Sequence, residues 1–198
     1  MMCGKYNKRK DYMPKAENKR GFTIIEVVLV LAIAGLIFLM VFIALPAMQR
    51  SQRDTQRRDT LSMMVTQITQ YQANNRNKLP GDAKDTVTPD SNGQIPDGEK
   101  GGWADFYRNY LLAQGDTFED PNGNPYELAV DVCTTKEGKC DRQASEKTFE
   151  DLNQNNVSTI YVTLGSSCEG ETVVPNPGSR KVTVSYKLEG GGTYCSGN

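Results

Sequence analysis

Histidine is absent from this 198-residue chain. The commonest general base and metal ligand of proteins is therefore missing. None of the five cysteines forms a C-x-x-C pair, which disfavours a zinc site. A phosphate-binding glycine loop and a nucleophile elbow are missing as well. Because no group of residues resembles an active site, we expect a protein that is not an enzyme and needs no cofactor.

Charge is absent from residues 27–48. These 22 residues are large and apolar apart from alanines, Gly35 and Pro46. At about 1.5 Å per helical residue they extend about 33 Å, the hydrocarbon thickness of a bilayer. One carboxylate, Glu26, precedes the run, and a carboxylate at the edge of hydrocarbon is costly unless a partner offsets its charge. We expect a membrane-spanning helix over residues 22–48.

Charge is unevenly distributed along the rest of the chain. Residues 1–21 carry seven basic and two acidic side chains, a net of +5, which leaves −6 for residues 22–198 because the whole chain carries −1. A basic end before one apolar span predicts a cytoplasmic N-terminus and a translocated body. The acidic body argues against non-specific DNA binding, so we expect nucleic acid only as an indirect partner.

A short motif, Gly21-Phe22-Thr23-Ile24-Ile25-Glu26, joins the basic end to the apolar run. It resembles the type IV prepilin signature, in which a glycine precedes Phe-Thr-Leu-Ile-Glu-Leu and an apolar helix, and the similarity covers residues 19–50. The resemblance implies that a membrane aspartyl peptidase, the prepilin peptidase, cuts between Gly21 and Phe22 and N-methylates Phe22. Residues 1–21 would then be a cytoplasmic leader, removed together with Cys3.

The resemblance also gives Glu26 a role in assembly. In pilin-like filaments the helices bundle, and this acid is thought to neutralise the amino terminus of a neighbouring subunit. An unpaired carboxylate in an apolar bundle costs several kcal/mol, and an ammonium in contact with it offsets much of that cost. Because only one axial offset brings the two groups together, the pair would also set the register between subunits.

A second helical pattern follows the span. From residue 61 onward, apolar side chains recur at helical spacing: Leu61, Met64, Val65, Ile68 and Tyr71. No glycine or proline occurs between Pro46 and Pro80, so we expect one helix from about Thr23 to about Asn75, with residues 49–76 as its amphipathic continuation. Pro46 lacks an amide hydrogen and is expected to kink this helix. The stripe covers about a heptad and a half, too short for a dimerising coiled coil.

Arginines cluster at the start of this continuation, on the side of the span where they oppose the expected orientation: Arg50, Arg53, Arg57 and Arg58. Asp54 and Asp59 offset part of their charge. Such a stretch could contact phospholipid headgroups or DNA. We favour a solvated face between subunits.

Residues 77–198 form the expected globular head. Residues 81–102 are rich in glycine, aspartate, proline and serine and predict a long loop. Aromatic side chains at helical spacing predict a short core helix over 103–113, anchored by Trp103. Strands are expected over 126–132, 159–164 and 181–188, with a closing segment at 193–195. The class is therefore α+β, and the resemblance implies the pilin ladle fold, a long N-terminal helix packed on a small antiparallel sheet of three to four strands.

The segment Asp120-Pro121-Asn122-Gly123-Asn124-Pro125-Tyr126 resembles the turn before the first strand of many major pseudopilins and some pilins. Proline, glycine and the Asp and Asn side chains are typical turn formers. Asp120, Asn122 and Asn124 also alternate like the first ligands of a calcium loop, but the sixth position is proline rather than glycine and the twelfth is aspartate rather than glutamate. A structural turn is the main interpretation, and calcium binding is the alternative.

Four cysteines remain once the leader is removed, an even number that suits disulfides in an oxidising exterior. Four cysteines allow three pairings. The closing strand and the terminal cysteine resemble those of pilins. Local closure favours Cys133 with Cys140, which closes a small hairpin, and Cys168 with Cys195, which ties a strand end to the last strand.

Three functions fit these features. The first is a structural subunit of a type IV pilus, the major pilin, serving adhesion, twitching motility or DNA uptake. The second is a pseudopilin of a type II secretion or competence machine, and the third is a monomeric membrane-anchored binding domain. The first implies three kinds of partner: other copies of this chain, the prepilin peptidase and the inner-membrane platform of the pilus. The chain would lie in the cytoplasmic membrane before assembly, and in an extracellular pilus or a periplasmic or wall-spanning pseudopilus afterwards.

Overall fold

The computed structural model describes residues 21–81, 85–112, 117–136, 138–140, 143–176 and 180–198. The leader residues 1–20, with Cys3, lie outside the described residues. The chain divides into two compact units, one ending at Ala44 and one comprising Leu45–Asn198. We describe each unit by itself.

Helix α1, Ile24–Asn74, has 51 residues and includes Pro46. Its bounds lie within one residue of those expected from the sequence. The helix ends where Arg76 and Asn77 adopt positive φ angles of 56° and 62°, and the Asn77 amide donates to the Gln72 carbonyl. The described side chains up to Ala44 are exposed apart from Ala34, which is half-buried. The kink expected at Pro46 stays a prediction.

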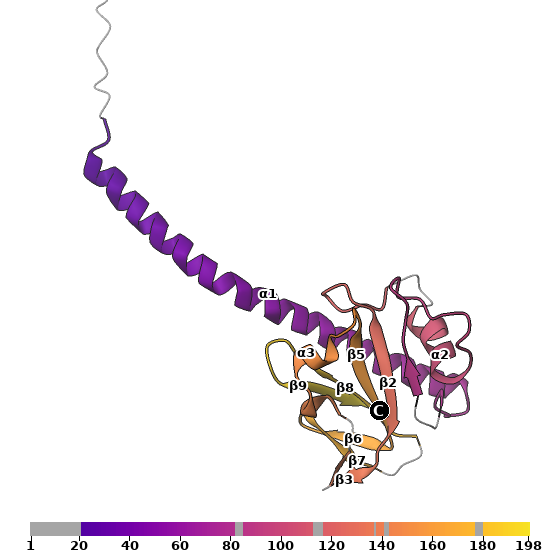
Figure 1. Ribbon diagram of the computed structural model, residues 1–198. Coiled ribbons are helices and arrows are strands. Elements are labelled where there is room, and N and C mark those ends of the chain that lie inside the picture. The colour runs from indigo at the N-terminus through magenta and orange to yellow at the C-terminus, as the bar shows by residue number, and fades with distance from the viewer. Residues whose placement is uncertain (1–20, 82–84, 113–116, 137, 141–142, 177–179) are drawn as a thin grey trace, which may run out of the picture. The chain divides into compact units, whose positions relative to one another are not determined.

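The remainder of α1 belongs to the second unit and packs against the head through one stripe. Leu61, Met64 and Ile68 are fully buried, as their spacing predicted. Val65 and Tyr71 are partly buried and pack against the same core. The sheet lies beside this part of the helix (Figure 1). The stripe is therefore a core face, which supports the argument against a coiled coil.

The central sheet has five strands in the order β1-β2-β5-β8-β9. Their bounds are Asp85–Val87, Tyr126–Val132, Ser158–Leu164, Val182–Lys187 and Thr193–Gly197. The α+β pilin architecture is confirmed, but the sheet is mixed rather than wholly antiparallel, because β2 and β5 run parallel with Tyr126 opposite Ser158. The connection between them, residues 133–157, is long enough for the crossover that parallel strands require. The short edge strand β1 lies inside the segment expected to be a loop.

The expected aromatic helix is split into two turns of different geometry. Helix α2, Gly102–Phe106, continues into the π-helix η1, Tyr107–Leu111. Trp103 is 1% exposed, and its ring meets that of Phe106 edge-on at 5.5 Å. These aromatic side chains belong to the head's hydrophobic core, as the sequence predicted.

Small elements complete the head. Two hairpins, a 3₁₀ turn and a short helix lie outside the main sheet: β3 Thr135–Lys136, β4 Lys139–Cys140, η2 Ala144–Glu146, α3 Phe149–Leu152, β6 Ser166–Glu169 and β7 Thr172–Pro175. A disulfide joins Cys133 to Cys140 across the β3–β4 hairpin. A second joins Cys168 on β6 to Cys195 on β9. These are the two pairs that local closure favoured.

Candidate functional site

The expected cleavage point lies just before α1, and the residues on either side of it are exposed. Gly21 has no atom within 4 Å of where a Cβ would be placed, and Phe22 is 89% exposed. Among the described residues, nothing therefore shields the Gly21–Phe22 peptide bond. An accessible segment outside regular secondary structure is the kind of substrate that a peptidase can bind.

The Glu26 carboxylate has a partner within its own chain. The backbone amide and the hydroxyl of Thr23 both donate to Glu26 Oε2, each at 2.8 Å, and the Glu26 amide lies 3.4 Å from the Thr23 hydroxyl. This is the reciprocal pattern of a capping box, which satisfies amide donors at a helix start. The Thr-x-x-Glu spacing carried that signal in the sequence, and our sequence reasoning missed it.

The second carboxylate oxygen of Glu26, Oε1, accepts no hydrogen bond from any described residue. An open groove of about 500 Å³ runs past this side chain and is otherwise apolar, lined by Phe22, Val27, Val30 and Leu31. The carboxylate is thus oriented by its own helix while one oxygen stays available to a further donor. Pairing with the amino terminus of a neighbour stays a prediction.

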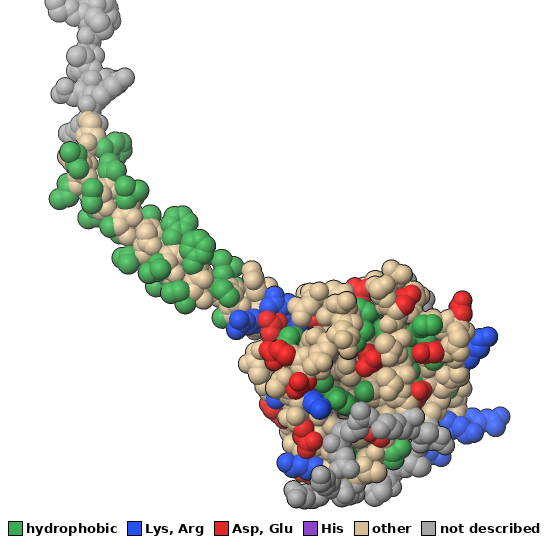
Figure 2. Space-filling view, in the orientation of Figure 1, with side chains coloured by type: hydrophobic (Ala, Val, Ile, Leu, Met, Phe, Trp, Pro, Cys, Tyr) green, Lys and Arg blue, Asp and Glu red, His purple; other side chains and the backbone are tan. Residues whose placement is uncertain are grey.

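The apolar part of α1 presents its side chains on all sides. Ile24, Met40 and Ile43 are among its most exposed large side chains, and the described part of the first unit carries apolar groups on the face shown (Figure 2). One helix in the described part of the chain, α1, is long and apolar enough to cross a membrane. A helix that is hydrophobic all round requires lipid or other protein to cover it.

A buried charge cluster occupies the arginine-rich part of α1. Arg57 is fully buried and donates two hydrogen bonds to the equally buried Asp120 carboxylate, at 2.7 and 3.0 Å. It also donates to Asp54 at 2.8 Å and to Glu189 at 3.3 Å. Glu189 in turn accepts from Arg53 Nε at 2.8 Å. The expectation of a solvated arginine face is therefore wrong for Arg57, because its partners arrive from two turns far along the chain.

Burial and pairing set the ionisation of this cluster. Burial would lower the pKa of Arg57, but its hydrogen bonds to Asp120 and Asp54 outweigh burial and raise that pKa. Its guanidinium carbon also lies 4.7 Å from the centre of the Phe149 ring, a favourable cation–π contact. The hydrogen bond from Arg53 lowers the pKa of Glu189. Arg57 therefore stays charged and ties α1 to both turns.

Asp120, the first of the three calcium candidates, is hydrogen-bonded within this charge cluster. Both Asp120 oxygens accept from Arg57, and the hydroxyls of Tyr126 and Tyr186 lie 3.3 and 3.4 Å from Oδ2. The Asn122 amide donates to Asp120 Oδ1, and the Asn124 carbonyl accepts from the Asp120 amide. The described residues contain no cluster of three or more His, Cys, Asp or Glu side chains that could hold a metal ion. The segment is a turn whose acid pairs with an arginine, so the calcium alternative loses its first ligand.

Comparison with known proteins gives one match. Residues 17–42 match the family model described as the prokaryotic N-terminal methylation motif, the cleavage and methylation signature of type IV pilins and pseudopilins. Neither the search of curated proteins nor that of solved structures gives a match. The motif supports a type IV pilin-like or pseudopilin protein, which is a structural rather than an enzymatic class.

The motif also bears on processing and location. It implies cleavage by a prepilin peptidase and anchoring in a membrane. Together with the apolar stretch of α1, it fits a membrane-anchored pilin precursor. The two disulfides and the pilin-like architecture agree with this class.

Proposed function

We propose that this chain is the major structural subunit of a type IV pilus. Prepilin peptidase cleaves it between Gly21 and Phe22, and the subunits then assemble by bundling their N-terminal helices. The pilus would serve adhesion, twitching motility or DNA uptake. The observation that carries the proposal is the methylation motif at the start of a helix whose apolar side chains are exposed on all sides.

Assembly exchanges one apolar environment for another. Before assembly the bilayer covers residues 22–48, and in the filament neighbouring helices replace the lipid. Glu26 distinguishes the two environments, because a neighbour's ammonium is available only in the bundle. Its capped conformation supports this role, since Thr23 holds Oε2 and leaves Oε1 for that ammonium.

The orientation follows from the distribution of charge and cysteine. The basic leader would stay in the cytoplasm and the head would be translocated. Two disulfides in the head suit an oxidising exterior. Partners are other copies of the chain, the prepilin peptidase and the inner-membrane platform, and any contact with DNA is indirect.

Shearing provides the test. Cells producing the chain are sheared, the released material is examined by electron microscopy, and the N-terminal peptide is sequenced by mass spectrometry. We expect abundant long fibres of this chain that begin with N-methylated Phe22. Glu26→Gln should leave the protein in the membrane but strongly reduce fibre yield. Normal fibres from that variant would contradict the assembly role of Glu26.

A pseudopilin is the second candidate, favoured by the likeness of the Asp120–Tyr126 turn to that of pseudopilins. The cysteine pair at the end of the chain favours a pilin instead. A pseudopilin would give methylated Phe22 without abundant sheared fibres. A monomeric membrane-anchored binding domain would give no fibres, and chemical cross-linking would join no copies of it.

A further inference from the structure

The four arginines that follow the apolar run fall into two pairs. Arg53 and Arg57 are committed within the chain to Glu189, Asp54 and Asp120. Arg58 is exposed and makes no hydrogen bond or ion pair with any described residue. Arg50 is 61% exposed and lies 3.7 Å from Glu189, whose oxygens already accept from the other pair. The fold therefore uses two of these cations and leaves two at the surface.

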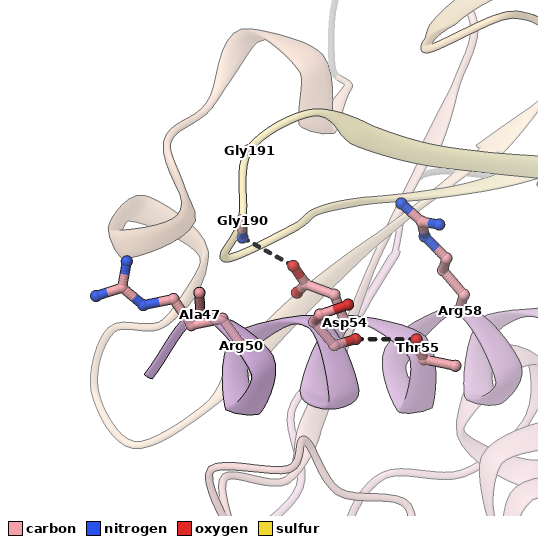
Figure 3. A pocket seen from close by; sticks show the side chains of 8 residues that line it. Ala47, Arg50, Asp54, Thr55, Arg58, Gly190 and Gly191 are labelled. Carbon is pink, nitrogen blue, oxygen red and sulfur yellow. Dashed lines mark hydrogen bonds between the residues drawn. The ribbon is translucent and has the colours of Figure 1, made fainter. Parts of the chain in front are cut away.

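The two more exposed arginines lie at the ends of one hollow. It has a volume of about 410 Å³ and lies between α1 and the turn at Gly190 and Gly191. Arg50 and Arg58 flank it, and Asp54 between them reaches to the Gly190 amide (Figure 3). The side chains of Ser51 and Thr55 also line it. The Thr55 hydroxyl donates to the Ser51 carbonyl at 2.9 Å, so the hollow offers two guanidinium groups and the Ser51 hydroxyl to a ligand.

Both oxygens of the acid in the hollow are hydrogen-bonded within the chain. Asp54 Oδ1 accepts from Arg57 and from the Glu189 amide, at 2.8 and 3.0 Å. Its Oδ2 accepts from the Gly190 amide at 2.8 Å. Arg53 and Arg57 carry +2 against −3 on Asp54, Asp120 and Glu189, so with Arg50 and Arg58 the groups around the hollow carry a net charge of +1.

The position of the hollow along the chain indicates its ligand. Arg50 follows Met48, the last residue of the uncharged run, by two residues, about 3 Å of helical rise. Arg58 follows by ten residues, about 15 Å, and its side chain leans back along the helix toward the N-terminus. The headgroup region extends about 5–8 Å beyond the hydrocarbon on each side, and long arginine side chains reach toward it.

We propose that this hollow binds the phosphate of an anionic phospholipid headgroup while the subunit is held in the membrane. Guanidinium groups recognise phosphate oxygens with charge-assisted hydrogen bonds, and the Ser51 hydroxyl adds a polar contact. The site holds the unassembled subunit at a fixed depth. It must release the lipid when neighbouring helices replace the bilayer.

Lipid titration of the full chain tests this site. The ¹⁵N-labelled protein in uncharged maltoside micelles is titrated with phosphatidylglycerol, and the arginine Nε–H signals are followed by NMR. We expect saturable shifts for Arg50 and Arg58 and none for Arg76, an exposed arginine just beyond α1. Each arginine should contribute about fivefold to the affinity, so Arg50→Gln/Arg58→Gln should weaken binding about 25-fold.

Control variants and ligands separate the alternatives. Arg76→Gln should leave the affinity unchanged, and Arg50→Lys/Arg58→Lys should retain most of it, with unchanged head amide signals showing that each variant folds. Inorganic phosphate or phosphatidylcholine that binds as tightly as phosphatidylglycerol would overturn the proposal. Chemical-shift changes of Arg50 and Arg58 that appear without lipid as protein concentration rises would also overturn it, because they would show that the hollow contacts another copy of the chain. The chain is unassembled throughout, so failure of this site and failure of pilus assembly are distinguishable.

Discussion

The buried ion pair between Arg57 and Asp120 supplies the sharpest test of how the head is attached to its helix. Arg57→Met removes the guanidinium and keeps most of the side chain's length. The Asp120 carboxylate then stays buried without a cation. Removing one member of a buried pair typically costs about 3–5 kcal/mol, because the remaining charge is uncompensated. We expect that loss in the free energy of unfolding.

The measurement is denaturant unfolding of the full chain in maltoside micelles, followed by the fluorescence of Trp103. This residue is the chain's single tryptophan and is 1% exposed. Arg58→Met is the matched control, because the adjacent Arg58 is exposed and should change stability by no more than about 0.5 kcal/mol.

A double variant separates lost charge from lost packing. In Arg57→Met/Asp120→Asn both members of the fully buried pair have lost their charge, while an amide oxygen still accepts from the Tyr126 hydroxyl. At least half of the stability lost in Arg57→Met should return. A cost below about 1 kcal/mol for Arg57→Met, against the 3–5 expected for a broken buried pair, would refute the argument. Equal losses in the single and double variants would do so as well.

Three further outcomes follow from the contacts. Pairing with Arg53 lowers the pKa of Glu189. The ion pair therefore stabilises the fold above the unfolded pKa of about 4.3, and this stabilisation is lost as pH falls through the lower folded pKa. In Glu189→Gln the free energy of unfolding should fall less steeply as pH is lowered from 5. The chain-entropy model gives about 3.6 kcal/mol for the 27-residue Cys168–Cys195 closure and about 2.4 for the 7-residue Cys133–Cys140 closure, so the paired serine variants should lower the free energy of unfolding in that order. Arg108 donates to the carbonyls of Pro96 and Glu99 and so holds the loop before α2. Arg108→Gln should therefore speed limited proteolysis within residues 89–101. An unchanged cleavage rate would argue that these two hydrogen bonds do not hold the loop.

Local patterns in the sequence predicted much of the fold. The extent of α1, its buried stripe and the three main strands each follow from spacing over a few residues. The parallel pairing of β2 with β5 does not, because an alternating strand looks the same whether its neighbour runs parallel or antiparallel. Strand β1 was missed because its three residues lie among turn formers and depend on pairing with β2.

Local sequence patterns did not predict the partners in the charge cluster, for a different reason. Arg57 lies 63 residues from Asp120 and 132 from Glu189, so no local pattern shows which acids it meets, although its position four residues before Leu61 and seven before Met64 puts it on the buried face of α1. Only the folded head brings the two turns to the helix. The partners of Arg57 are therefore a property of tertiary structure, whereas its burial follows the helical spacing of the apolar stripe.

The capping box at the start of α1 orients a side chain that we propose contacts a neighbouring subunit. A free carboxylate at a helix start could rotate among several conformations, and pairing with a neighbour would have to restrict it. Thr23 already fixes Glu26 through two bonds to one oxygen, so part of that restriction is made before the partner arrives. Thr23→Val removes the hydroxyl bond and keeps the backbone one. If orientation of the carboxylate matters for assembly, this variant should lower fibre yield even though the charge on Glu26 is intact.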